Sequence, residues 1–116
     1  MTTKSILLAI ADPQALVDIT QALGAGWEAT SVASEADAFT QIENQSFDAV
    51  LVDYDLSDGK GTEVIRHLRA GRFRGVIVAV SAKDDGNALL RSAGAHAVCK
   101  KAELYRIAAT LAALAR

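Results

Sequence analysis

The sequence predicts an α/β fold in which a five-stranded parallel sheet carries helices on both faces. Short apolar runs alternate with segments of helical periodicity five times along the chain, and the connections are short. Two runs, 49–52 and 76–80, are apolar throughout, which is typical of strands buried on both faces. Because crossovers between parallel strands are right-handed, few topologies remain. The order 2-1-3-4-5 is the common one for five strands, and it gives a flavodoxin-like (βα)5 domain.

The strands are expected where apolar residues run together or alternate with polar ones. The first run stops at Asp12-Pro13, and the third stops at Asp53. The second run alternates in polarity, which favours a position near the edge of the sheet. The expected strands are residues 5–11, 27–33, 47–53, 76–80 and 97–99.

The helices are marked by apolar residues spaced three and four apart and by start and stop signals. Pro13 suits a first helical position, and Gly24 follows the apolar stripe of the first helix. Ser34 with Asp37 resembles a capping box that uses the shorter acid. The expected helices begin at Pro13, after Ser34, at Thr62, at Asp84 and at Ala102.

Composition indicates one globular domain covering residues 1–116. Hydrophobic residues make up 51 % of the chain and charged residues 22 %, and the net charge is −2. This balance does not point to nucleic acid or to a membrane surface. The single cysteine, Cys99, excludes an intrachain disulfide and fits a reducing compartment. The first apolar run is too short for a signal peptide or a membrane span, so we expect a soluble cytoplasmic protein.

Polar residues stand at the ends of the predicted strands. Asp12 follows the first strand, Asp53 ends the third, Ser81 follows the fourth and Lys101 follows the fifth. Because a parallel sheet gathers these ends along one edge, the side chains are expected to converge where open α/β sheets bind ligands. Carboxylate oxygens suit Mg²⁺, and an aspartate can itself be a nucleophile towards a phosphoryl group.

With these residues the chain resembles the receiver domains of bacterial two-component response regulators over essentially its whole length. The motifs that carry the resemblance are Asp12 after the first strand, Asp53 in Val-Asp-Tyr-Asp-Leu-Ser-Asp-Gly-Lys-Gly, Ser81 in Ala-Val-Ser-Ala, and Lys101. Gly61 also falls eight residues after Asp53, as it does in the family pattern.

The resemblance implies a role for each residue. Asp53 would accept the phosphoryl group, and Asp12, Asp53 and the backbone carbonyl of Asp55 would hold Mg²⁺. Ser81 would be the hydroxyl that moves towards the phosphoryl group, and Lys101 would be its counter-charge. The chain would then be a signalling module in a phosphorelay and not an enzyme, apart from self-catalysed phosphoryl transfer to Asp53 and hydrolysis from it.

The resemblance also implies partners. A histidine kinase or a phosphotransfer protein would supply the phosphoryl group. A downstream protein would bind the surface formed by the helix at 84–92, the strand at 97–99 and the helix from 102. Direct binding to nucleic acid or a membrane is not expected, and self-association into a homodimer is left open.

The chain departs from the family pattern at several positions. The family usually has two acids after the first strand, and here the first of them is Ala11. We therefore expect Mg²⁺ binding to be weakened roughly 10–100-fold, by comparison with other outer-shell partners of metals. A second register would place the pair at Ile10-Ala11, but the first register turns Leu16 and Ile19 inward. The other departures are Ser57, Val98 and Ala102, where the family has proline, an aromatic residue and proline.

Two other functions remain as alternatives. The departures would also suit a pseudo-receiver, which has the same fold but binds partners without phosphorylation. Asp53-Tyr54-Asp55 further resembles the nucleophile pair of haloacid dehalogenase-type phosphatases. Those enzymes place the pair after their first strand and have a later acidic motif, which this chain lacks beyond Lys101. His67 and His96 have no partner at metal-ligand spacing and are interpreted as surface residues.

Overall fold

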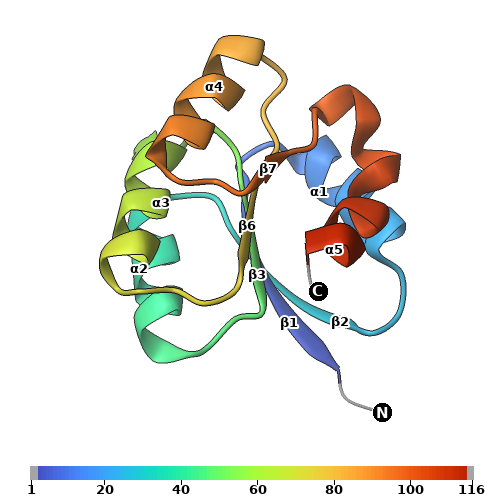
Figure 1. Ribbon diagram of the computed structural model, residues 1–116, viewed down its shortest axis with the longest axis horizontal. Coiled ribbons are helices and arrows are strands. Elements are labelled where there is room, and N and C mark those ends of the chain that lie inside the picture. Colours follow the sequence, from blue (N-terminus) through green and yellow to red (C-terminus); the bar gives the residue numbers. More distant parts are fainter. Residues whose placement is uncertain (1–2, 115–116) are drawn as a thin grey trace.

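The computed structural model describes residues 3–114 and confirms the predicted sheet. Five parallel strands are ordered β2-β1-β3-β6-β7, which is the predicted order 2-1-3-4-5 once a separate two-stranded ribbon is set aside. In Figure 1 the sheet is seen nearly edge-on, with helices to either side. The strands of the sheet are β1 (Lys4–Ala9), β2 (Trp27–Val32), β3 (Ala49–Val52), β6 (Val76–Ala79) and β7 (Ala97–Val98).

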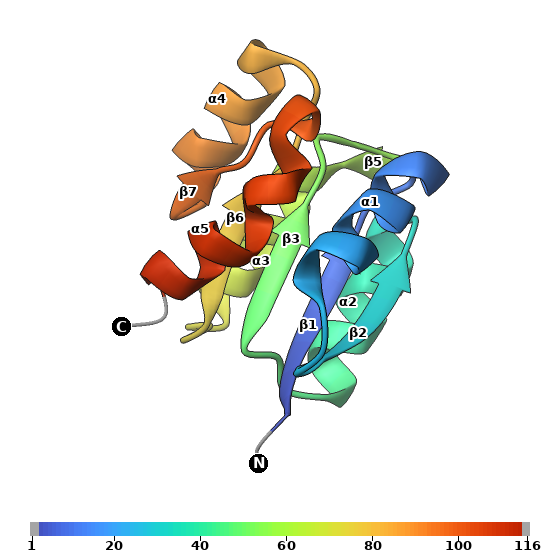
Figure 2. The same ribbon diagram turned by 90° about the vertical axis from the view of Figure 1, so that its right-hand side faces the viewer.

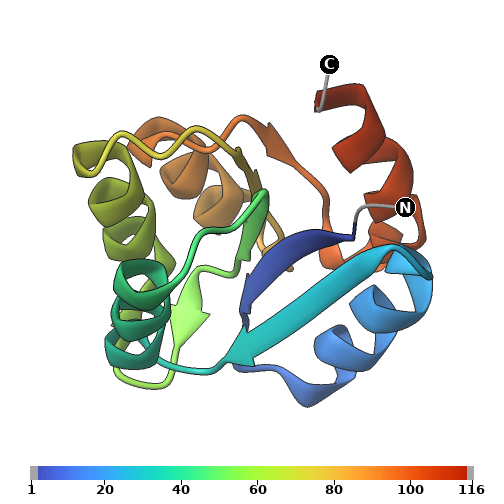
Figure 3. The ribbon, with the colours of Figure 1, turned by 90° about the horizontal axis from the view of Figure 1, so that it is seen from below.

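Two layers of helices cover the two faces of the sheet (Figures 1 and 3). On one face lie α1 (Pro13–Leu23), the 3₁₀ helix η1 (Lys101–Arg106) and α5 (Ile107–Leu114). On the other face lie α2 (Glu35–Asn44), α3 (Gly61–Ala70) and α4 (Asp84–Ala93). Figure 2 shows α1 and α5 in front of the sheet with α2 and α3 behind it.

The strands separate two hydrophobic cores because successive side chains of a strand point to opposite faces. In β3, Leu51 packs into the core beneath α1 and α5, whereas Val50 and Val52 pack into the core beneath the other three helices. All three side chains are fully buried. This two-sided burial accounts for the uninterrupted apolar run that predicted the strand.

The structure corrects three expectations about local elements. The first strand ends at Ala9, so Ile10 and Ala11 belong to the connection that follows. The predicted loop 54–61 contains an antiparallel ribbon formed by β4 (Asp55–Leu56) and β5 (Gly59–Lys60). The helix expected from Ala102 begins instead as a 3₁₀ helix. This 3₁₀ segment, Lys101–Arg106, buries Leu104, and α5 begins at the next residue, Ile107, which is also buried.

The interpretation of His96 as a surface residue needs correction, because its side chain is hydrogen-bonded to the backbone of β6. Its side chain is half-buried, and its Nδ1 accepts a hydrogen bond from the backbone N–H of Ile77 at 2.9 Å. The backbone N–H of His96 donates to the carbonyl of Ile77 at 2.8 Å. Burial, assisted by the charges of Arg69 and Arg91, lowers the pKa of His96 below its ordinary value. Cys99 is buried, as expected. Within residues 3–114, no helix has the length and apolar character needed to cross a bilayer.

Replacing Leu51 with alanine should test how far the fold depends on the central strand. Leu51 is 0 % exposed, so the Leu51→Ala change should reduce the free energy of unfolding by about 2–5 kcal/mol. Leu89 is 49 % exposed, so Leu89→Ala should change it by no more than about 0.5 kcal/mol. Urea unfolding followed by circular dichroism measures both, and equal losses would contradict the assignment of the core.

Candidate functional site

Asp12 is the first residue of the site along the chain, and it lies in the connection between β1 and α1. Its side chain is the N-cap of α1, and its Oδ1 accepts hydrogen bonds from the backbone N–H groups of Gln14 at 3.0 Å and Ala15 at 3.4 Å. Capping uses Oδ1 and leaves Oδ2 facing the edge of the sheet, where it meets Lys101. Asp12 is therefore both a helix cap and a member of the predicted cluster.

Lys101 joins the two predicted carboxylates. Its Nζ lies 2.5 Å from Oδ2 of Asp53 and 3.2 Å from Oδ2 of Asp12. Asp53 is only 4 % exposed, and its Oδ1 accepts a hydrogen bond from the N–H of Tyr54 at 2.7 Å. Burying a carboxylate without a partner costs free energy, and the Lys101 ammonium is the partner of Asp53. The structure thus brings together three of the residues that the sequence predicted to converge.

The ion pairs shift the titration of two of these groups. The hydrogen bond from Lys101 is the main reason that the pKa of Asp12 lies below 3.8. Burial acts against the Lys101 ammonium, but hydrogen bonds and charge attraction from Asp53 and Asp12 outweigh it and raise the pKa of Lys101 above 10.5. Asp12 therefore adds stability that is lost as pH falls through its lowered pKa. The contribution of Lys101 is present below pH 10.5 and is lost as pH rises through its raised pKa.

Ser81 occupies the end of the neighbouring strand and is held there by Asn87. The Ser81 N–H donates to Oδ1 of Asn87, and Nδ2 of Asn87 donates to the Ser81 carbonyl, both at 2.9 Å. Both residues are 4 % exposed. Gly86 lies against the Ser81 hydroxyl, since a Cβ there would be 2.9 Å from Oγ. Sequence reasoning missed Asn87 and Gly86; a polar residue on the buried side of an otherwise apolar helix face was the only available signal.

Asp55 borders the site, but its side chain is directed elsewhere. It is exposed and forms an ion pair with Lys60, which also lies 4.9 Å from the centroid of the Tyr54 ring. The hydrogen bond from Lys60 is the main reason that the pKa of Asp55 is lowered. The Asp55 carboxylate is therefore paired with Lys60, and the role of its backbone carbonyl stays a prediction.

All five predicted residues line one hollow of about 300 Å³ at the carboxyl edge of the sheet. The residues that line it are Ala11, Asp12, Asp53, Asp55, Ser81, Ala82, Lys83 and Lys101. Ala11 lies inside this hollow, at the position where the family usually has an acid. The alanine that replaces the family's usual acid therefore lies within the candidate site.

The donor set has the oxygen chemistry of a magnesium site that keeps several of its waters. Within residues 3–114, no group of three or more histidine, cysteine, aspartate or glutamate side chains is arranged to hold a metal. Two carboxylates with a backbone carbonyl nevertheless form an oxygen-only set, and Mg²⁺ is commonly bound by one or two carboxylates, waters and phosphate oxygens. The Lys101 ammonium contacts both carboxylates, which shows that they attract a cation to one point.

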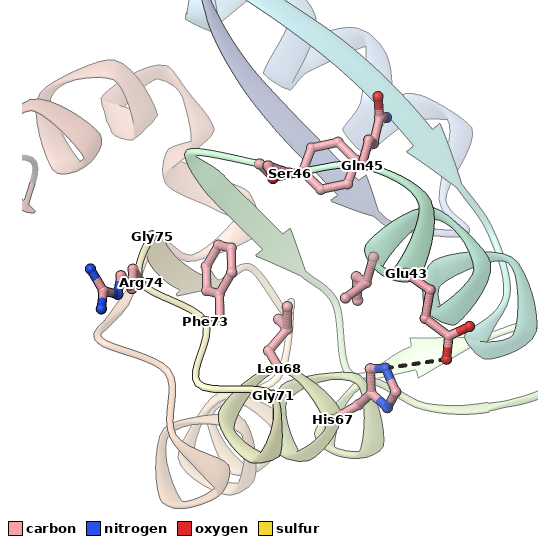
Figure 4. A pocket seen from close by; sticks show the side chains of 11 residues that line it. Glu43, Gln45, Ser46, His67, Leu68, Gly71, Phe73, Arg74 and Gly75 are labelled. Atoms are coloured by element: carbon pink, nitrogen blue, oxygen red, sulfur yellow. Dashed lines mark ion pairs between the residues drawn. The ribbon is translucent and has the colours of Figure 1, made fainter.

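A larger hollow, of about 470 Å³, lies at the opposite end of the molecule between the ends of α2 and α3. Figure 4 shows the ring of Phe73 and the side chain of Leu68 facing into it, with Glu43 and His67 at its rim. The Glu43 and His67 side chains are 4.0 Å apart. Its walls are largely apolar and include none of the predicted site residues, so size alone does not identify the candidate site.

The comparisons with known proteins agree with the observed fold. A family model for the response regulator receiver domain matches residues 6–111. The chain belongs to this family. No curated protein matches it.

Solved receiver structures resemble this receiver domain along nearly its whole length. A CheY-like response regulator receiver domain protein from Methanospirillum hungatei JF-1 is 25 % identical, with 97 % of each chain covered and a TM-score of 0.79. The phosphorylated cyanobacterial phytochrome response regulator RcpA is 18 % identical, with 92 % of this chain and 89 % of that chain covered and a TM-score of 0.80. The Mn²⁺-bound form of response regulator Rcp1 is 15 % identical, with coverage of 90 % and 88 % and a TM-score of 0.74. These last two show a shared fold.

Replacing Lys101 and Lys60 separately should show which lysine lowers the pKa of each carboxylate. Lys101→Ala should raise the pKa of Asp12 towards its ordinary value of 3.8, because the main hydrogen bond that lowers it is lost. Lys60→Ala should do the same for Asp55 and leave Asp12 unchanged. Carboxyl ¹³C chemical shifts followed as a function of pH measure both groups. If Lys60→Ala moved Asp12 as far as Lys101→Ala does, the ion-pair assignment would be wrong.

Proposed function

We propose that this receiver domain accepts a phosphoryl group on Asp53 from a bacterial histidine kinase or phosphotransfer protein, in the cytoplasm, and then signals by protein contact. One observation carries the proposal: a single ammonium, that of Lys101, contacts the carboxylates of both Asp12 and Asp53 at the carboxyl edge of the sheet. Phosphoryl transfer depends mainly on positioning and on neutralising charge. The hollow provides a candidate nucleophile, a side-chain cation and a hydroxyl for these purposes.

In the proposed step, a carboxylate oxygen of Asp53 attacks the phosphorus of a phosphohistidine on the partner. An O–P bond forms, the P–N bond breaks, and its electron pair stays on the imidazole nitrogen. Both oxygens of Asp53 have partners, so the Lys101 ammonium must leave Oδ2 and follow the charge to the phosphoryl oxygens. When bound by Asp12, Asp53 and the Asp55 carbonyl, Mg²⁺ would neutralise charge on those oxygens.

Ser81 supports the same step from the neighbouring strand. Asn87 holds the backbone of Ser81 on both sides, and the Ser81 Oγ accepts a hydrogen bond from the N–H of Lys83 at 3.3 Å. That hydroxyl can donate to a phosphoryl oxygen on Asp53, and its movement would report phosphorylation to α4. No catalytic activity beyond phosphoryl transfer to Asp53 and hydrolysis from it is proposed.

Large exposed apolar side chains support an output surface on α4, β7 and η1. Leu89 is 49 % exposed, Val98 is 37 % exposed and Tyr105 is 75 % exposed. Exposed apolar side chains are frequent at protein contact sites, and Tyr105 also borders the groove between η1 and α1. We propose that a downstream protein or a second copy of the domain binds there.

A phosphorylation-independent pseudo-receiver remains the second candidate, because specific residues favour it. Ala11 lines the hollow but supplies no carboxylate to it. Val98 stands where the family has an aromatic residue, and a valine is too small to act as a ring that alternates between exposed and buried positions. In this case the surface of α4, β7 and η1 would bind its partner constitutively.

An amide NMR titration with beryllofluoride and Mg²⁺ separates the two candidates. Beryllofluoride imitates a phosphoryl group bound to Asp53, so a competent receiver should show shifts around Asp53, Ser81 and Lys101. The Asp53→Asn variant is the control, and its shifts should vanish because the acceptor oxygen is lost. Unchanged spectra at saturating Mg²⁺ would favour the pseudo-receiver.

Restoring the missing acid gives an independent test of the metal assignment. The Ala11→Asp variant should bind Mg²⁺ about 10–100-fold more tightly, the range typical of outer-shell partners of metal ligands. Amide shifts during a Mg²⁺ titration give both dissociation constants. Ala82→Asp places a new carboxylate on the same hollow away from Asp12 and serves as the control. An equal gain from both variants would indicate general charge attraction and not a metal site.

A further inference from the structure

The loop that follows Asp53 is fastened to the start of α2 by a side chain far away in sequence. The Asp58 carboxylate accepts hydrogen bonds from the backbone N–H of Glu35 at 2.6 Å and of Ala36 at 3.2 Å. The helix has its own N-cap as well, since Oγ of Ser34 accepts from the N–H of Asp37 at 3.0 Å. The first turn of α2 is therefore capped twice, once locally and once by the loop.

The fastening is reciprocal. Oε2 of Glu35 accepts a hydrogen bond from the backbone N–H of Lys60 at 2.9 Å. The N–H of Ser57 donates to the carbonyl of Ala33 at 2.9 Å. At Gly59 a Cβ would overlap the Glu35 carboxylate, so a residue without a side chain allows this approach. We call the contacts made by Asp58 and Glu35 across this junction the loop clamp.

The loop clamp lies one strand away from the predicted metal-binding carbonyl. Lys60, which donates to Glu35, is paired with Asp55 in the ribbon of β4 and β5. Next to this pair, the Gly61 N–H donates to the Tyr54 carbonyl at 2.8 Å. Moving the clamped strand would therefore move the backbone of Asp55 relative to Asp53.

We propose that Asp58 and Glu35 are positioning residues for metal binding at the Asp12 and Asp53 site. The inference rests on the proposed function. A surface loop is normally among the most mobile parts of a domain, and a metal ligand on such a loop must be ordered before it can bind. The loop clamp orders this loop in advance. Because Ala11 contributes no carboxylate, the site relies more heavily on the backbone ligand that the clamp holds.

Two cap-removing variants separate positioning from helix stability. Asp58→Ala and Ser34→Ala each remove one N-cap of α2, but only Asp58→Ala removes a contact between the helix and the loop. In metal-free protein, the amide of Lys60 should exchange with solvent faster in Asp58→Ala than in Ser34→Ala. In a Mg²⁺ titration followed by amide shifts, Asp58→Ala should bind roughly tenfold more weakly, as for other outer-shell partners of metals, and Ser34→Ala should bind like the original protein.

Glu35 supplies the second arm of the test. Glu35→Gln keeps an oxygen that can accept from the Lys60 N–H and should retain Mg²⁺ affinity, whereas Glu35→Ala should lose it as Asp58→Ala does. Equal losses in Asp58→Ala and Ser34→Ala, or none in either, would overturn the positioning role while the proposed function stands. If the unchanged protein binds no Mg²⁺, both the proposed function and this inference fail.

Discussion

The candidate site depends on the repulsion between two carboxylates at one edge of a parallel sheet. Asp12 and Asp53 are brought together because β1 and β3 are neighbours and end at the same level. Like charges at close range destabilise a fold unless a cation lies between them. In this protein that cation is Lys101, which arrives from the far end of the chain. The magnesium ion that we propose for this site would therefore compete with the Lys101 ammonium for the same negative charge.

The rigidity of this edge comes from the two cores beneath it. Strand β3 is buried on both faces, so the backbone that carries Asp53 has little freedom. The backbone of Ser81 is held in a different way, because the Asn87 side chain bonds both its N–H and its carbonyl. Lys101 reaches this edge through a long side chain, and the Ser81 hydroxyl is held through its oxygen by the N–H of Lys83 at 3.3 Å. The candidate site thus combines a carboxylate on a rigid backbone with a long side-chain ammonium and a hydroxyl.

Sequence reasoning located the sheet and the converging residues because both follow from period and topology. An apolar run ending in Asp53 needs no knowledge of distant contacts to be interpreted. The ribbon in the following loop escaped prediction, since its two-residue strands are too short to show a period. The contacts of Asp58 with Glu35 were equally hidden, because they join residues 23 apart that each look like ordinary surface acids. Polar contacts between elements that are distant along the chain are therefore difficult to predict from the sequence.

The double capping of α2 has a consequence for the length of the loop beside it. Surface loops usually tolerate insertions, because lengthening a flexible connection has a small entropic cost. This loop is bounded by Asp53 at one end and held by the first turn of a helix in its middle. One inserted residue between them would leave two N–H groups of that helix without acceptors. In this receiver domain a connection on the surface is therefore as constrained in length as a strand in the core.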